Sequence, residues 1–150
     1  MGLVHRLITD RWFLSAIIAP VPFWYLLAAL NINQLFITQA TITHMLMVVM
    51  VYPFIEELCF RGLIQGHLFN TLGAHKAWMG FSAANAITSI AFTLLHLIYH
   101  ESLLAIAVLL PSLIFGFFKD RYQSIVPGLI LHSWYNSGLF WFFTLYLAIS

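Results

Sequence analysis

Charged residues are scarce in this 150-residue sequence, which has six Lys and Arg and five Asp and Glu. Soluble domains carry about 25% charged residues, whereas this chain has 7%. So few charged side chains cannot cover the surface of a soluble domain of this length. We therefore expect an integral membrane protein with a single domain over residues 1–150. The net charge of +1 provides no basic field for nucleic acid, so no nucleic-acid partner is expected.

Cysteine is almost absent as well. The single Cys59 excludes an internal disulfide and any metal site built from cysteines alone. The sequence also has no internal repeat and no low-complexity tract, so neither a repeat architecture nor a linker between domains is indicated.

Long apolar runs are what the sequence does contain. A membrane-spanning helix needs about 20 mostly apolar residues, and five segments qualify: 12–30, 38–70, 78–99, 102–118 and 125–149. Pro20 and Pro22 are expected to kink the first segment, because proline removes a helical N–H. The runs predict an all-α fold, a polytopic integral membrane helical bundle of about five transmembrane helices.

Basic residues between the runs predict the orientation of the bundle. Arg6 and Arg11 precede the first segment, and five crossings would put Lys76, Lys119 and Arg121 on the same side. The connection on the opposite side carries only Glu101. The positive-inside rule then predicts a multi-pass protein of the cell membrane with a cytoplasmic N-terminus.

Residues 56–61, Glu-Glu-Leu-Cys-Phe-Arg, place two acids and a guanidinium inside an apolar stretch. A charge in the membrane costs a contested amount between about 2.5 and 17 kcal/mol, and such residues usually mark function. Glu57 and Arg61 are four residues apart, so they can pair on one helical face. Glu56 is rotated from Glu57 by about 100° and becomes a candidate general base. The alternative is a packing ion pair, with Glu56 reaching interfacial water.

Two other apolar segments carry polar residues at helical spacing. His96 lies near the end of the third segment, and His132 and Asn136 share one face of the fifth. A lone buried histidine is more often a hydrogen-bonded packing residue, and a polar pair in a membrane helix often joins two helices. The occurrence of polar groups on three of the five segments favours a functional site.

Helix heights bear on whether these groups can meet. Counted from the connection 71–77 at about 1.5 Å per residue, Glu56 and His96 differ in height by roughly 6 to 9 Å. Pro53 cannot donate to the carbonyl of Val49 and is expected to bend the second segment, which would help to close the gap. A shared site near mid-membrane is thus a hypothesis for the three-dimensional structure.

The three polar groups resemble the three signature motifs of the CPBP family: Glu56-Glu57-x-x-x-Arg61, Phe92-x-x-x-His96 and His132-x-x-x-Asn136. These are the CAAX-processing and bacteriocin-processing intramembrane proteases, also called the Abi family. Each motif alone is weak, but all three in the family's order on apolar segments are specific. The chain is close to the minimal core and so resembles the short prokaryotic members, including the JDVT-CTERM sorting type.

The resemblance implies an intramembrane endopeptidase that hydrolyses a peptide bond of a membrane-associated protein, by CAAX-type or C-terminal sorting-tail processing. It implies that Glu56 and His96 activate water. It also implies that His132 and Asn136 stabilise the oxyanion. The remaining motif residues have supporting roles: Glu57 and Arg61.

We expect a glutamate mechanism without a metal or other cofactor. One carboxylate and two histidines could instead hold zinc, so the zinc-dependent version stays open. The implied partners are a membrane-anchored protein or peptide substrate and the lipid bilayer. Self-association, as a homo-oligomer, would supply helices that longer members have.

Two other functional classes fit the same residues. A non-catalytic membrane immunity or binding protein could keep this scaffold without using its chemistry. An ion or proton pathway is the other class, since intramembrane Glu and His also build relays.

Overall fold

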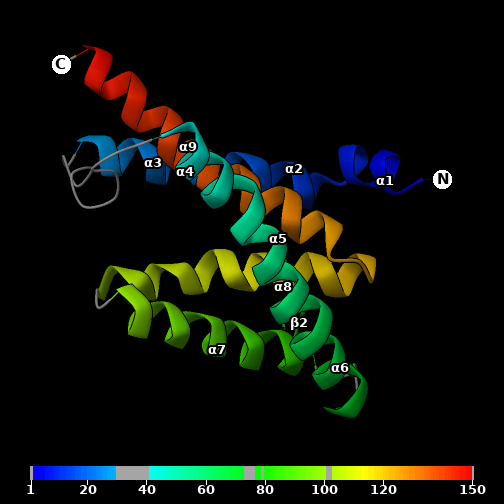
Figure 1. Cartoon of the computed structure of the whole chain (residues 1–150). Coiled ribbons are helices and arrows are strands. Elements are labelled where there is room, and N and C mark those ends of the chain that lie inside the picture. Colours follow the sequence, from blue (N-terminus) through cyan, green and yellow to red (C-terminus); the bar gives the residue numbers. More distant parts are fainter. Residues whose placement is uncertain (1, 30–40, 73–76, 79, 101–102, 150) are drawn as a thin grey trace. The chain divides into compact units, whose positions relative to one another are not determined.

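The computed structural model describes residues 2–29, 41–72, 77–78, 80–100 and 103–149 (Figure 1). These residues are helical except for turns and a short antiparallel ladder between β1 (Ala77–Trp78) and β2 (Phe81–Ser82). The predicted all-α class is therefore confirmed. Backbone contacts divide the chain into two compact units: Met1–Pro53 with Leu131–Ser150, and Phe54–Ile130. The single domain over residues 1–150 stays a prediction.

The first unit contains the N-terminal helices and most of the last helix. Its elements are α1 (Leu3–Thr9), α2 (Arg11–Ile18), α3 (Pro20–Ala29), α4 (Ile42–Leu46), the π-helical η2 (Met47–Val51), the start of α5 (Tyr52–Glu56) and most of α9 (Val126–Ile149). The break between α2 and α3 at Ala19, directly before Pro20, is the interruption predicted for the first apolar segment.

Side chains of α9 bind carbonyl groups at the broken end of α2. Pro20 has no N–H, so the carbonyl of Ala16 loses the donor that a continuous helix would supply. The Tyr135 hydroxyl donates to this oxygen at 2.8 Å, and Trp134 Nε1 donates to the oxygen of Ile17 at 2.8 Å. The proline break therefore becomes an attachment point for α9.

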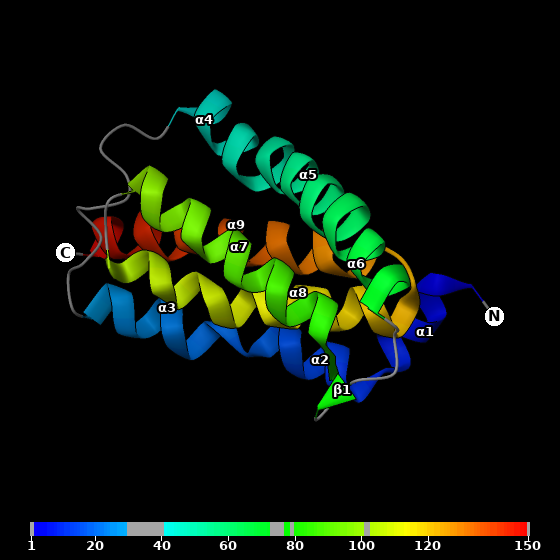
Figure 2. The ribbon, with the colours of Figure 1, turned by 90° about the horizontal axis from the view of Figure 1, so that it is seen from below.

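The second unit contains the Glu-Glu motif and a helical hairpin. Its elements are the end of α5, the π-helical η3 (Glu57–Gln65), α6 (Gly66–Leu72), the β1–β2 ladder, α7 (Ala83–His100), the 3₁₀-helical η4 (Leu103–Val108), α8 (Leu109–Tyr122) and the start of α9. In Figures 1 and 2, α7 and α8 lie side by side and run in opposite directions.

Among the described residues, one continuous helical segment is long and apolar enough to cross a membrane, Ile42–Leu72. It corresponds to the predicted segment 38–70. Shorter apolar helices cover Arg11–Leu27 and Ala83–Tyr99. The number of five spans stays a prediction. The predicted connection 31–37, Lys76 and Glu101 lie outside the described residues.

Two predicted boundaries are wrong. The third apolar segment begins as the β1–β2 ladder, and its helix starts at Ala83 instead of residue 78. The fourth does not end at residue 118, because α8 continues through Lys119 and Asp120 to Tyr122. Both charged side chains find partners inside the second unit, so here they do not mark a loop. Gln123 ends α8 in the left-handed conformation, with φ 50°.

Helix α7 carries its polar residues inward and its apolar residues outward. Three of its buried polar side chains follow one another at intervals of four residues, Asn85, Ser89 and Thr93, and Thr88 is buried beside them. The exposed side chains of α7 include large apolar ones, with exposed fractions of 47% to 75%: Ile87, Ile90, Leu94 and Ile98. This reverses the pattern of a helix in water and is expected where lipid surrounds the outer face.

Candidate active site

The Glu-Glu motif lies where the helix changes its winding. Glu56 is the last residue of α5, and Glu57 is the first of η3. A π-helix bonds i to i+5, so it holds more residues per turn than the about 3.6 of an α-helix, and residues four apart stay closer to one line. Glu57, Arg61 and Gln65 are accordingly all buried, with exposed fractions of 1%, 0% and 0%. Glu56 is half-buried.

The guanidinium of Arg61 joins three helices. The expected ion pair is present, with Glu57 Oε2 3.7 Å from Arg61 Nε. The hydrogen bonds of Arg61 go elsewhere: Nη1 donates to Gln65 Oε1 at 3.0 Å and to Ser89 Oγ on α7 at 3.3 Å. Nη2 donates to Ser112 on α8, at 2.8 Å to its backbone oxygen and also to its hydroxyl. Arg61 therefore holds η3 against α7 and α8, as well as balancing Glu57.

Gln65 continues this buried network towards the end of α8. Its Nε2 donates to the oxygen of Gly116 at 2.9 Å and to Asp120 Oδ1 at 2.8 Å. The other carboxylate oxygen of Asp120 accepts from the hydroxyl of Ser82. A continuous set of polar contacts thus runs from Glu57 to Ser82 through the interior of the second unit.

Several members of this network were not predicted from the sequence. Gln65 could have been found, because it repeats the four-residue step from Glu57 to Arg61. Ser112 and Asp120 could not, because an isolated serine in an apolar run and a charged pair after it carry no recognisable pattern. The predicted supporting role of Glu57 and Arg61 stays a prediction.

Only glycine fits at position 116, where α8 passes close to the buried network. A Cβ added there would overlap the amide of Asn85 and lie 2.8 Å from Gln65 Oε1. Both side chains are bonded in place, Asn85 by its Nδ2 to the oxygen of Leu113 at 2.9 Å. Neither can move without losing a buried hydrogen bond.

We therefore expect Gly116→Ala to lower the free energy of unfolding by about 1–3 kcal/mol, as for other overpacked sites. Gly66→Ala is the matched control: its Cβ would meet only the oxygen of Arg61, at 3.8 Å. In a helix that change is neutral or stabilising by roughly 0.5–1 kcal/mol. Unfolding of the purified protein in detergent measures both, and equal stability of the two variants would contradict the expectation.

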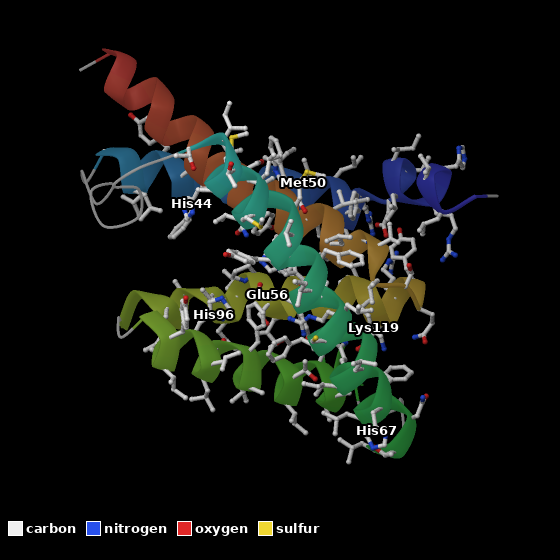
Figure 3. All side chains as sticks on the ribbon, viewed as in Figure 1. His44, Met50, Glu56, His67, His96 and Lys119 are labelled. Carbon is white, nitrogen blue, oxygen red and sulfur yellow. The ribbon has the colours of Figure 1, made fainter. Side chains whose placement is uncertain are left out.

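The contacts between η3 and α7 follow a regular register. Phe60 meets the ring of Phe92 edge-on, with centroids 4.9 Å apart, and the next residue, Arg61, meets Ser89, three residues before Phe92 on α7. Later residues of η3 thus contact earlier residues of α7. Glu56 and His96 are each one turn of four residues from the Phe60–Phe92 contact, in the direction away from the loop. Figure 3 labels both residues, Glu56 at the end of α5 and His96 on α7.

The start of α7 also changes the height expected for His96. Because α7 begins at Ala83 instead of residue 78, five residues fewer separate His96 from the start of its helix. At 1.5 Å per residue this lowers the height of His96 along its helix by about 7.5 Å.

The ring of His96 is oriented by its own helix. Its Nδ1 lies 3.0 Å from the oxygen of Phe92, and the two rings are stacked with centroids 4.3 Å apart. A carbonyl oxygen only accepts, so this hydrogen bond requires the proton on Nδ1. In the neutral ring Nε2 is then the acceptor and can take up a proton.

The third motif belongs to the first unit. His132 is buried, with an exposed fraction of 6%, and Asn136 is half-buried. Asn136 Nδ2 donates to the backbone oxygen of Val48 at 2.9 Å. Glu56 and His96 are thus in one unit and His132 and Asn136 in the other. That all four meet stays a prediction.

The π-helical turn before Pro53 shifts the backbone bonding by one residue, while the bend expected at Pro53 stays a prediction. In an α-helix Pro53 would leave the carbonyl of Val49 without a donor. In the π-helical turn Tyr52 N–H instead donates to the oxygen of Met47, one residue further back than in an α-helix. The carbonyl that faces Pro53 is therefore that of Val48, and the Asn136 amide donates to it.

Among the described residues, no three His, Cys, Asp or Glu side chains are grouped so that they could hold a metal ion. The mechanism without metal stays a prediction and is tested below.

Comparison with known proteins identifies one family. Residues 38–138, which contain all three motifs, match the family model described as type II CAAX prenyl endopeptidase Rce1-like. The match covers more than half of the chain. No curated protein and no solved structure matches it.

Proposed function

The chain belongs to the Rce1-like family of type II CAAX prenyl endopeptidases, and from this premise we propose that it is a glutamate-type intramembrane endopeptidase. Membership makes it a membrane protein of the CAAX protease class, a hydrolase whose substrate is a membrane-associated protein. The short sorting-tail subtype and the choice between a prenylated and an unprenylated tail belong to the proposal.

The observation that supports the proposal is the register between η3 and α7, in which Phe60 meets Phe92 and Arg61 meets Ser89. In the proposal this register continues by one turn to Glu56 and His96. Hydrolysis of a peptide needs a base for water and a proton donor for the leaving amine. In the proposed mechanism Glu56 takes a proton from water while His96 Nε2 orients the same water. The water oxygen attacks the scissile carbonyl, and the protonated carboxyl returns the proton to the leaving nitrogen.

The developing oxyanion needs hydrogen-bond donors, and in the proposal His132 and Asn136 supply them. An asparagine amide has two N–H donors, and one of those of Asn136 is bonded to Val48. That bond holds the amide in one orientation, as a preorganised donor requires. We also propose about five membrane spans and a cytoplasmic N-terminus, from the charges that flank the apolar segments.

A cleavage assay tests the proposal. The purified protein in liposomes is given membrane-anchored peptides with a prenylated CAAX tail or an unprenylated hydrophobic sorting tail, and the products are identified by mass spectrometry. A single new terminus near the anchored tail is the expected result. Absence of cleavage for every peptide, with ion flux across the same liposomes, would favour a proton or ion pathway instead.

Removal of divalent metals tests the mechanism. We expect the protein treated with a strong chelator, and shown by elemental analysis to lack zinc, to cleave at the untreated rate. The reason is that Glu56 itself supplies the base that a zinc-bound hydroxide would otherwise provide. If chelation abolishes the activity and added zinc restores it, the zinc-dependent version is established.

A further inference from the structure

A pocket that the proposed chemistry does not use lies in the second unit, at the ends of α6 and α8 and the start of α9. Its volume is about 280 Å³, and its lining includes Gly66, Phe69, Asn70, Lys119, Ser124 and Ile125. Pockets for drug-sized ligands have about 300–1,000 Å³, so this one suits a small group.

The lysine of this pocket is unusually enclosed for a charged residue. Lys119 has an exposed fraction of 7%, and its Nζ lies 5.0 Å from the centroid of the Phe69 ring. Its nearest acid is Asp120, with 3.6 Å between Nζ and Oδ1. That distance is too long for a hydrogen bond. Within the part of the chain that the structure describes, the Lys119 ammonium makes no hydrogen bond.

Asp120 does not occupy the donors of Lys119, because its carboxylate is bonded on the other side. Oδ1 accepts from Gln65 Nε2 at 2.8 Å, and Oδ2 accepts from the hydroxyl of Ser82. The ammonium therefore keeps its N–H donors for a group in the pocket. The Asp120 carboxylate at 3.6 Å balances the charge of Lys119 but accepts none of its N–H donors, so an anion in the pocket would add the charge-assisted hydrogen bonds that this pair lacks.

The other polar groups of the pocket are donors too. The Ser124 oxygen accepts from Val126 N at 3.2 Å, which leaves its O–H to donate into the pocket. Asn70 brings an amide, and the first turn of the 24-residue α9 begins directly after Ser124. A buried ammonium, a hydroxyl and a helix start together match the oxygens of a phosphate.

The apolar lining and the position of the pocket indicate the source of that phosphate. Phe69 and Ile125 cover one side, where an acyl glycerol stem could lie. The pocket is at the ends of three helices, where their apolar runs stop, which is the level of lipid headgroups in a membrane protein. Basic pockets between membrane helices are known to bind anionic headgroups. We propose that this pocket binds the headgroup of an anionic phospholipid, with its phosphate at Lys119 (Figure 3).

Lipid binding to the full chain in detergent tests the proposal. Phosphatidylglycerol is titrated against phosphatidylcholine, and bound lipid is counted by native mass spectrometry. We expect phosphatidylglycerol to bind preferentially and Lys119→Gln to weaken that binding about tenfold or more, as for the loss of a charge-assisted hydrogen bond. Arg121→Gln is the matched control: it removes the same charge two residues later on α8, from an exposed side chain, and should leave the preference unchanged.

A second variant blocks the pocket without touching the lysine. Gly66 lines the pocket, and a Cβ there would meet only the oxygen of Arg61, at 3.8 Å. Gly66→Leu should therefore fill the pocket and abolish the preference, while Gly66→Ala should keep most of it. If Lys119→Gln does not fold, the pair of Gly66 variants decides. Equal binding of the two lipids to the unmodified protein would overturn the proposal, as would preference retained in both Lys119→Gln and Gly66→Leu. If inorganic phosphate displaces phosphatidylglycerol with an affinity equal to that of the lipid, the assignment of the pocket to a lipid is overturned.

Discussion

Glu56→Gln is expected to lower the rate of tail-peptide cleavage by about 10²- to 10⁴-fold, the range that a positioned general base contributes. Glutamine has the shape of glutamate but cannot take a proton from water. Glu56 is half-buried, whereas the contacts that join η3 to α7 and α8 are centred on the fully buried Arg61. The loss should therefore be in kcat, with the unfolding midpoint close to that of the unmodified protein.

His96→Ala should lower the rate as well, because in the proposed mechanism His96 lies level with Glu56 and orients the same water. If the two residues act as a unit, the double variant should be scarcely slower than the less active of the two single variants, since such effects are not additive. Cys59→Ser is a suitable control: Cys59 is exposed and lies in the same π-helical segment. Cleavage by Glu56→Gln at the unmodified rate would refute the assignment and favour a non-catalytic binding or immunity protein.

Arg61→Met is expected to lower the free energy of unfolding by about 3–5 kcal/mol, as when one partner of a buried ion pair is removed. Arg61 has an exposed fraction of 0% and donates to Gln65, Ser89 and Ser112. Methionine fills much of the volume but offers no donor. The buried acceptors on α7 and α8 then lose their bonds to η3, and the carboxylate of Glu57 loses its ion-pair partner.

Arg121→Met provides the comparison, because Arg121 is exposed on α8. Surface substitutions of this kind usually change stability by about 0.5 kcal/mol or less. Unfolding of both variants in mixed detergent micelles, followed by circular dichroism, gives the difference. A stability of Arg61→Met equal to that of Arg121→Met would show that the network does not hold the second unit together. Activity of a folded Arg61→Met protein would separate this supporting role from the chemistry of Glu56.

The sequence anticipated those parts of the site that depend on spacing along one helix. The pair Glu57–Arg61 follows from a four-residue step, and the interruption at Ala19 follows from Pro20. It did not anticipate the partners of Arg61, because Ser89 and Ser112 approach from other helices and nothing in their local sequence distinguishes them. The sequence predicted the end of the fourth segment at residue 118, because local pattern cannot show that the Asp120 carboxylate is bonded to Gln65 and Ser82 inside the fold.

The sequence by itself determined that this chain is helical and embedded in lipid, and that its few polar groups fall into three motifs, because composition and helical periodicity are local properties. The tertiary structure decided the winding of η3, which brings Glu57, Arg61 and Gln65 onto one buried line. It also decided which carbonyl Pro53 leaves for Asn136, and the register in which Phe60 meets Phe92 and Arg61 meets Ser89. Each of these depends on contacts between segments far apart in the chain, where packing and hydrogen-bond satisfaction outweigh local preference.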